Sequence, residues 1–453
     1  MVKEKMLEKT NALCNVCLKK IRAEIIEINS SIYLKKTCQE HGEQIELLEE
    51  EAEYHNLKKE YDKPGNKIIP ETNLRRGCPF DCGLCSEHQQ HTCNAIIDIT
   101  EQCDLNCPTC YASSGKGKHL DLRSIEKIMD YFQKAENNQA EILQISGGEP
   151  TTHPQILEII ELAKSKKFRY VMLNTNGLRI ARDLEFVEKL ARFRDRFEIY
   201  LQFDGFSEDT YKKLRGKQNL LNIKLKAIEN LKKFNIPITL VATVQKDLND
   251  KEIGKLFEFA INTPGIRGIN FQPVAFFGRT QEASTKDRIT LSGIIKRLVQ
   301  QTGSSLKTKD IIPLPCNVWT VGVSYFYRDD KGFLPLTRHI DVKSYLPLID
   351  NTFGFDAEKI LKEKNNLIGC CDCVTKFFSS LSKIIPKDYK KMSNEEQMAW
   401  WDKHSFRVSI VQFLDKFNFN EKFVKKECVH FITPDLKRIP FSTYNLLYRK
   451  NYK

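Results

Sequence analysis

Residues 140–177 read AEILQISGGEPTTHPQILEIIELAKSKKFRYVMLNTNG and alternate between strand-like and helix-like patterns. The first apolar run ends in a glycine-rich turn at SGGEP. Apolar residues at helical spacing follow over 153–167, and a second apolar run covers 168–177. A strand, a helix and a strand in this order form a β/α unit, whose two strands lie parallel in one sheet. The segment therefore predicts an α/β protein with a parallel sheet.

The same alternation extends in both directions along the chain. Strand-like runs occur at 94–100, 140–150, 168–177, 196–205, 236–245 and 265–274, with helix-like stretches between them. Six such strands predict a partial (β/α)6 barrel, in which polar residues just past the strand ends converge on one site. Those residues are Cys103, Gly147 to Glu149, Asn174 to Asn176, Gln202 to Asp204, and Gln272.

The cysteines predict metal sites in a reducing compartment. The chain has 15 cysteines, an odd number that cannot pair completely. Its first residues, MVKEKMLEKTNALC, are basic, favour a helix and lack the apolar core of a secretory signal. We therefore expect a cytoplasmic protein whose thiols bind metals. The net charge of +12 is not accompanied by an RNA-binding module, so we expect no nucleic-acid partner.

The stretch EQCDLNCPTCYA, residues 101–112, holds three cysteines directly after an apolar run. Cys103, Cys107 and Cys110 have C-x3-C-x2-C spacing. A closed zinc or 4Fe-4S site needs four protein ligands, whereas three thiolates leave one iron of a cluster open to a small molecule. A zinc knuckle that takes its fourth cysteine from elsewhere is the alternative.

Three further cysteine groups predict additional metal sites. One is a complete set of four, which favours a closed 4Fe-4S cluster with a zinc ribbon as the alternative: Cys78, Cys82, Cys85 and Cys93. A second group has metal-knuckle spacing and favours zinc, with a mononuclear iron as the alternative: Cys14, Cys17, Cys38 and His41. The sequence leaves open whether His41 is a ligand. A third cluster is expected from three or four of the tail cysteines, although Cys428 could equally be a buried free thiol: Cys316, Cys370, Cys371, Cys373 and Cys428.

The three-cysteine motif, the SGGEP turn and the β/α repeat together resemble the radical S-adenosylmethionine (radical SAM) superfamily. The resemblance implies that Cys103, Cys107 and Cys110 hold an open 4Fe-4S cluster, which S-adenosylmethionine completes to form a 5′-deoxyadenosyl radical that abstracts hydrogen. It also implies contacts with S-adenosylmethionine from six residues: Gly147, Gly148, Glu149, Asn174, Asn176 and Gln202. The chain departs from the family in having Thr109 where an aromatic residue often precedes the third cysteine, with Tyr111 just after it.

The order of the motifs resembles a branch that includes tetraether lipid synthases and pterin methylase-like proteins. It implies a rubredoxin-like N-terminal metal unit over 1–60, an auxiliary iron-sulfur segment over 61–93, a radical SAM core over 94–280 and a C-terminal iron-sulfur and substrate unit over 281–453. We expect the enzyme to join the terminal carbons of isoprenoid lipid chains. The alternative is C-methylation of a pterin or similar small heterocycle, and a non-catalytic electron carrier is disfavoured because it needs no open iron.

The lipid interpretation carries expectations about partners. Apolar stretches at 274–280, 318–327 and 441–449 would line a channel, and Arg279, Arg328 and Arg338 would meet phosphate headgroups. We therefore expect peripheral contact with a membrane surface, together with a low-potential electron donor that reduces the cluster.

Overall fold

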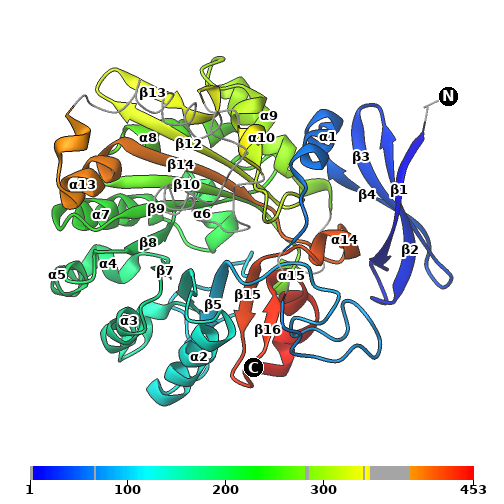
Figure 1. Cartoon of the computed structure of the whole chain (residues 1–453), viewed down its shortest axis with the longest axis horizontal. Helices are drawn as coiled ribbons and strands as arrows, with labels where there is room; N and C mark the ends of the chain where they lie inside the picture. The colour runs from blue at the N-terminus through cyan, green and yellow to red at the C-terminus, as the bar shows by residue number, and fades with distance from the viewer. Residues whose placement is uncertain (1–3, 66–67, 281–284, 340–341, 347–387, 453) are drawn as a thin grey trace, which may run out of the picture.

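Two β-sheets organise the described part of the chain, which in this computed structural model comprises residues 4–65, 68–280, 285–339, 342–346 and 388–452 (Figure 1). A four-stranded sheet holds the N-terminal strands in the order β1-β2-β3-β4. A twelve-stranded sheet holds the rest in the order β11-β12-β14-β10-β9-β8-β7-β6-β5-β15-β16, with β13 paired to β12. Figure 1 shows the small N-terminal sheet at one side of the larger body.

The six predicted parallel strands are confirmed and lie side by side in chain order. They are β5 (Asn94–Asp98), β6 (Ile142–Ser146), β7 (Tyr170–Thr175), β8 (Phe197–Gln202), β9 (Ile238–Val244) and β10 (Ile266–Pro273). Helices connect them: α2 (Leu122–Ala135), α3 (Ile156–Ser165), α4 (Leu178–Arg182), α5 (Leu184–Ala191), α6 (Glu208–Arg215), α7 (Leu220–Lys233) and α8 (Ile253–Asn262). The predicted α/β partial barrel is therefore present.

The helices cover the outside of the barrel because each has one apolar face. In α2 the buried residues Ile125, Ile128, Met129 and Phe132 lie at i, i+3, i+4 and i+7, on one face of the helix. Asp121 caps the helix by accepting a hydrogen bond from the Ser124 amide. These side chains pack against buried strand residues in one continuous core. The inward-facing strand residues are therefore left to line the barrel interior.

Strands from the C-terminal segment extend both edges of the barrel sheet. β14 (Ser405–Val411) runs parallel to β10, β12 (Val321–Asp329) runs antiparallel to β14, and β15 (Val429–Ile432) runs parallel to β5. The remaining elements of this segment are α9 (Leu291–Gln301), β11 (Ile312–Pro313), β13 (Gly332–Pro335), α10 (Val342–Tyr345), α13 (Asn394–His404), α14 (Glu421–Val424), β16 (Arg438–Pro440) and α15 (Phe441–Thr443). The segment predicted as a C-terminal unit thus contributes strands to the core sheet, and the domain boundaries stay predictions.

The N-terminal sheet is an antiparallel meander followed by one helix. It consists of β1 (Lys5–Leu13), β2 (Lys20–Ile28), β3 (Ser31–Cys38) and β4 (Gly42–Glu49), and α1 (Ala52–Tyr61) follows. The expected N-terminal helix is wrong, because residues 5–13 pair with β2 along their length. Buried Lys36 ties the sheet to the barrel side by donating to the carbonyls of Leu13, Lys416 and Phe417.

Candidate functional site

The loop after β5 carries the three central cysteines. Cys103, Cys107 and Cys110 line one cavity at the carboxyl ends of the barrel strands. Backbone bonds shape the loop: the Cys103 amide donates to the Gly115 carbonyl at 2.9 Å. Arg279 joins it to the end of the barrel, since its guanidinium donates to the Cys107 carbonyl at 2.8 Å and its amide donates to the Cys110 carbonyl at 3.1 Å.

The glycine-rich turn after β6 packs directly against the chain that enters this loop. The Gly148 and Glu149 amides each donate at 2.7 Å, to the carbonyls of Thr100 and Gln102 respectively. A Cβ on Gly147, whose φ is +138°, would lie 2.4 Å from the Thr100 oxygen, and one on Gly148 would lie 2.2 Å from the Gln102 oxygen. Glycine is required at both positions because of this close backbone approach.

Glu149 organises the turn from inside. Its Oε1 accepts hydrogen bonds from the Thr151 amide and hydroxyl and from the Thr175 hydroxyl, and its Oε2 accepts from the Asn176 amide at 2.7 Å. Burial raises the pKa of Glu149, and these donors oppose the rise. A carboxylate has about four lone-pair sites, so Oε2 retains room for one more donor such as a ligand ammonium.

The cavity brings the predicted ligand-contact residues together. Its lining includes the three cysteines and all six predicted contacts: Gly147, Gly148, Glu149, Asn174, Asn176 and Gln202. Thr109 also lines it but donates its hydroxyl to the Leu214 carbonyl at 2.9 Å. Tyr111 lines it as well and packs on Phe441 with ring centroids 5.4 Å apart.

Two cations beside the cysteine loop, Lys224 fully buried and Arg215 mostly so, were missed by the sequence reasoning. Arg215 bonds the fully buried Asp204 carboxylate, and the Lys224 ammonium donates to the Asn176 carbonyl and to Gln202 Oε1. Burial lowers the pKa of Lys224 to about 8, against the attraction of Asp204. A signal for Lys224 was present, because it shares the buried face of α7 with Leu220, Ala227 and other apolar residues.

The central loop suits a metal cluster on chemical grounds. Burial raises the pKa of the Cys103 thiol to about 12 and also raises that of Cys107, where Arg215 opposes the rise. Thiols must lose their protons to bind metal, and nearby positive charge offsets the cost of the resulting negative charge. Three thiols around one cavity, with two cations beside them, fit a 4Fe-4S cluster bound through three ligands.

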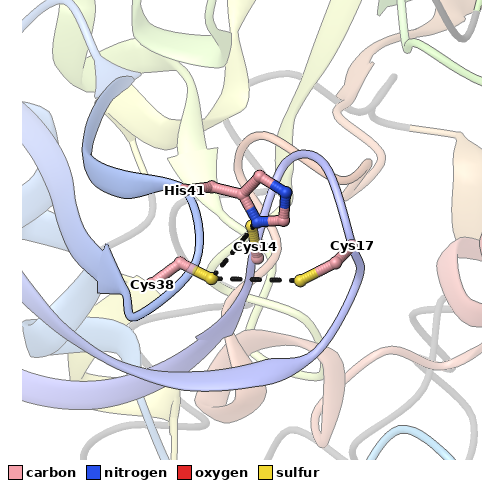
Figure 2. A group of neighbouring side chains, drawn as sticks. All are labelled: Cys14, Cys17, Cys38 and His41. Atoms are coloured by element: carbon pink, nitrogen blue, oxygen red, sulfur yellow. Dashed lines mark hydrogen bonds between the residues drawn. The ribbon is translucent and has the colours of Figure 1, made fainter.

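The N-terminal sheet holds a compact set of four metal-binding side chains (Figure 2). The ligand atoms of Cys14, Cys17, Cys38 and His41 all lie within 4.8 Å of one another. The His41 Nδ1 lies 3.4 Å from Cys38 Sγ and 3.6 Å from Cys14 Sγ, so the histidine, left open by the sequence, joins the set. Burial opposes ionisation of Cys14, but backbone amides and the Gln44 amide lower its pKa to about 6. The set fits a tetrahedral metal ion.

Comparison with known proteins assigns the chain to a family. A family model described as the Radical SAM superfamily matches residues 97–260, and one described as the HMPTM N-terminal zinc ribbon domain matches residues 6–50. The 7,8-dihydro-6-hydroxymethylpterin dimethyltransferase of Methanocaldococcus jannaschii is 35% identical over 98% of this chain and 94% of its own length. The chain belongs to the radical SAM superfamily.

Two further comparisons cover less than half of the chain. The AdoMet-dependent heme synthase of Methanosarcina barkeri is 31% identical over 36% of this chain and 45% of its own length. The solved structure of Streptococcus suis SuiB bound to precursor peptide SuiA has 18% identity and a TM-score of 0.40, covering 48% of this chain and 46% of that one. Superfamily membership makes S-adenosylmethionine and a 4Fe-4S cluster the cofactors of this enzyme, as predicted.

The predicted joining of isoprenoid lipid chains is wrong for this radical SAM enzyme. The relative that matches it end to end carries the name of a pterin dimethyltransferase. The arginines expected at headgroups are used within the protein: Arg279 bonds the cysteine loop, Arg328 donates to the Ile261 carbonyl, and Arg338 pairs with Asp310. Within the described residues, no helix is both long and apolar enough to cross a bilayer.

The auxiliary cysteines group differently from the sequence expectation. Cys78, Cys82 and Cys85 line one small cavity, but Cys93 lies with Cys316 and Cys428 instead. The physical reason is that Cys93 directly precedes β5, where its amide donates to the Cys428 carbonyl in the neighbouring chain segment. The predicted set of four is therefore divided between two places in the radical SAM fold.

Cys93, Cys316 and Cys428 form a fully buried thiol group. Their sulfur atoms lie within 4.8 Å of one another, and His91 Nε2 lies 3.7 Å from Cys93 Sγ. Cys428, left open as a free thiol by the sequence, thus has the surroundings of a ligand. Cys370, Cys371 and Cys373 lie outside the described residues.

The remaining group repeats the spacing of the radical SAM motif. Cys78, Cys82 and Cys85 have the same C-x3-C-x2-C spacing as the central cysteines, a signal that the sequence reasoning overlooked. Tyr448 holds their loop, since its hydroxyl accepts from the Cys82 amide and donates to the Pro79 carbonyl, both at 3.0 Å. Without Cys93 the loop offers three thiols, as the central loop does.

Proposed function

We propose that this radical SAM enzyme methylates a reduced pterin or a closely related small heterocycle. The observation that carries the proposal is the end-to-end match to a pterin dimethyltransferase, at 35% identity over 98% of this chain. The match includes the N-terminal metal domain and the C-terminal strands, so it extends beyond the core that superfamily members share.

The barrel supplies a place for such a substrate beside the cysteine loop. A second cavity lies inside the barrel and shares six lining residues with the cysteine-loop cavity: Tyr111, Asn174, Val241, Gln272, Phe413 and Phe441. Phe413 and Phe441 stack with their ring centroids 3.7 Å apart, and both residues line both cavities. Aromatic side chains at this junction keep water away from a reactive carbon.

When bound, the cluster and S-adenosylmethionine supply a 5′-deoxyadenosyl radical. The chain's part is to hold the reactants and exclude water. Oε2 of Glu149 accepts the ligand ammonium, the GGEP turn keeps the cysteine loop in place, and Arg215 with Lys224 offsets negative charge. Reduction of the cluster requires a low-potential electron donor, which we propose as a partner.

We also propose ligand roles for the cysteines. Cys103, Cys107 and Cys110 hold the open cluster. Three further sites complete the metal content: Cys14, Cys17, Cys38 and His41 bind zinc or iron; Cys78, Cys82 and Cys85 bind a second cluster; and Cys93, Cys316 and Cys428 bind a third metal group. The N-terminal and the Cys93 groups are supported by ligand atoms within 4.8 Å of one another, the other two groups by shared cavities, and the N-terminal site also by the zinc-ribbon match.

The test is an anaerobic reaction of the reconstituted enzyme with a strong reductant, S-adenosylmethionine and 7,8-dihydro-6-hydroxymethylpterin. Mass spectrometry should show a pterin heavier by one or two methyl groups, and S-adenosylmethionine with a deuterated methyl group shows whether that methyl is transferred. A Cys107→Ala variant is the matched control and should give no product. Formation of 5′-deoxyadenosine with unchanged pterin would contradict the proposal.

A further inference from the structure

The second cavity lies inside the barrel and adjoins the cysteine-loop cavity. Its cavity volume is about 100 Å³, and it is lined by side chains from β5 to β10 and from β12, β14 and β15. These are the alternate, inward-facing positions of each strand, such as Ile142 and Gln144 on β6 or Asn270 and Gln272 on β10. The C-terminal strands therefore complete a chamber that the six core strands leave open.

One side of this chamber is polar, and we call it the polar wall. Its residues are Tyr200 on β8, Asn270 and Gln272 on β10, and Arg407 and Ser409 on β14. Asn270 and Ser409 stand directly opposite each other in the parallel β10–β14 ladder. The lining from β5, β6, β7 and β15 combines four apolar side chains with three amides, two of which bond each other at 3.0 Å (Asn94 to Gln144). The apolar residues are Ile96, Ile142, Met172 and Val429, and the third amide is Asn174. The side facing the polar wall thus mixes apolar and amide side chains, and the charged side chain of the lining, Arg407, belongs to the polar wall.

Hydrogen bonds fix the centre of the polar wall before any ligand arrives. The fully buried Asn270 accepts from the Ser409 hydroxyl at 2.9 Å and donates to the Tyr200 hydroxyl. The Tyr200 oxygen therefore serves as an acceptor there, and its own hydrogen is available for another acceptor. Such a preorganised network loses little freedom when a ligand binds.

Arg407 is the charged member of the wall. A third of its side-chain surface (33%) is accessible although it lines an interior chamber, and its Nη2 lies 3.6 Å from Oε1 of Glu198, which is 5% exposed. A guanidinium carries five N–H donors and no acceptor, so it requires ligand acceptors rather than hydrocarbon. Glu198 balances its charge, which favours a neutral carbonyl group over an anion such as phosphate.

We infer that the polar wall binds the oxygen- and nitrogen-bearing edge of a flat heterocycle, with Arg407 donating to its ring carbonyl oxygen. The inference rests on the proposed function, because it takes that heterocycle to be a pterin. Apolar side chains of the opposite side, Ile96, Met172 and Val429, pack on the ring face, and the far edge of the ring points to the junction with the cysteine-loop cavity. A saturated lipid chain would offer no acceptor to the Arg407 guanidinium or to the Tyr200 hydroxyl hydrogen.

Binding measurements on the anaerobic, reconstituted enzyme test this inference. The probe is 6-hydroxymethylpterin, whose fluorescence reports binding without turnover. Arg407→Met should weaken its binding at least about tenfold, which is the loss expected for one hydrogen bond from a charged donor. Arg194→Met, the same change at an exposed position outside both cavities, should leave binding unchanged.

A second probe tests the atom that Arg407 contacts. In 6-hydroxymethyl-2,4-diaminopteridine an amino group replaces the ring carbonyl oxygen, so a donor faces the guanidinium. Wild-type enzyme should prefer the oxo compound at least about tenfold, and Arg407→Met should lose most of that preference. Equal binding of the two probes to wild-type enzyme would overturn the inference whatever the variants do.

Arg407→Met leaves Glu198 buried without its cation, so a folding control is needed. The double variant Arg407→Met/Glu198→Gln removes both charges at similar volume and should show the same loss of binding with a native circular dichroism spectrum. Unchanged pterin binding in folded variants would overturn the inference while the methylation proposal stands. Arg407-dependent binding of pterin that is never methylated would support the inference and contradict the proposed function.

Discussion

Arg215 and Asp204 form a two-point ion pair beside Cys107. The Arg215 Nε and Nη2 atoms lie 2.7 and 2.6 Å from the two Asp204 carboxylate oxygens, and Asp204 is fully buried. The Thr243 amide donates to the same carboxylate at 3.0 Å. The pair therefore joins the last residue of α6 to the ends of β8 and β9, next to the cysteine loop.

Arg215→Met should destabilise the enzyme strongly. It leaves a buried carboxylate without its cation, which typically costs about 3–5 kcal/mol in the free energy of unfolding. Chemical denaturation of the metal-free protein gives this value. Lys189→Met removes the exposed pair with Glu185 and should cost less than about 1 kcal/mol. If the two variants lose equal stability, the buried pair does not have the role assigned to it.

Gly148→Ala should disturb the cysteine loop through the backbone. The new Cβ would lie 2.2 Å from the Gln102 oxygen, so either the turn or the loop must move. We expect a lower melting temperature and less iron retained after reconstitution. Gly115→Ala is the control in the same loop, because its Cβ would meet only Arg279, at 3.9 Å. Equal iron retention by both variants would speak against the close approach.

The regrouped cysteines predict which substitutions affect the same metal. Cys93→Ser and Cys428→Ser should each lose one metal group, and the double variant should lose no more, because both thiols belong to one site. Cys85→Ser combined with Cys428→Ser should lose two. Iron, zinc and sulfide are counted per chain. If Cys93→Ser and Cys85→Ser instead lost the same metal group, and their double variant lost no more, the grouping expected from the sequence would be correct.

His55 predicts a pH dependence of stability. Burial, together with the charge of nearby lysines, lowers its pKa to about 3. In the unfolded state the histidine has a pKa near 6.5, so between about pH 6.5 and pH 3 it is protonated there but not in the folded state. The free energy of unfolding therefore decreases as the pH falls below about 6.5. From this residue we expect a loss of about 2 kcal/mol between pH 8 and pH 5.

Urea denaturation of wild type and His55→Leu at both pH values measures that contribution. The variant should lose stability less steeply, because leucine carries no titrating group in place of the buried ring, which packs 5.6 Å from Trp319. His339→Leu, at an exposed position, should leave the wild-type difference unchanged. Identical pH dependence in wild type and His55→Leu would contradict the assignment.

The barrel strands and the cysteine loop could be predicted from the sequence because their signals are local. Apolar runs with helical stretches between them indicate β/α units wherever they occur, and the spacing of Cys103, Cys107 and Cys110 lies within one loop. The GGEP turn follows its strand directly. Resemblance to radical SAM proteins added the cofactors, but the substrate inferred with it was wrong, since the shared core does not encode the substrate.

Only the tertiary structure decided which distant segments meet. Cys93 lies with Cys316 and Cys428, more than 200 residues away in the chain, because β15 pairs with β5 and carries Cys428 to the start of that strand. Arg407 enters the barrel because β14 pairs with β10. Such pairings satisfy the hydrogen bonds and bury the apolar faces of strands far apart in sequence, and no local pattern records the partner.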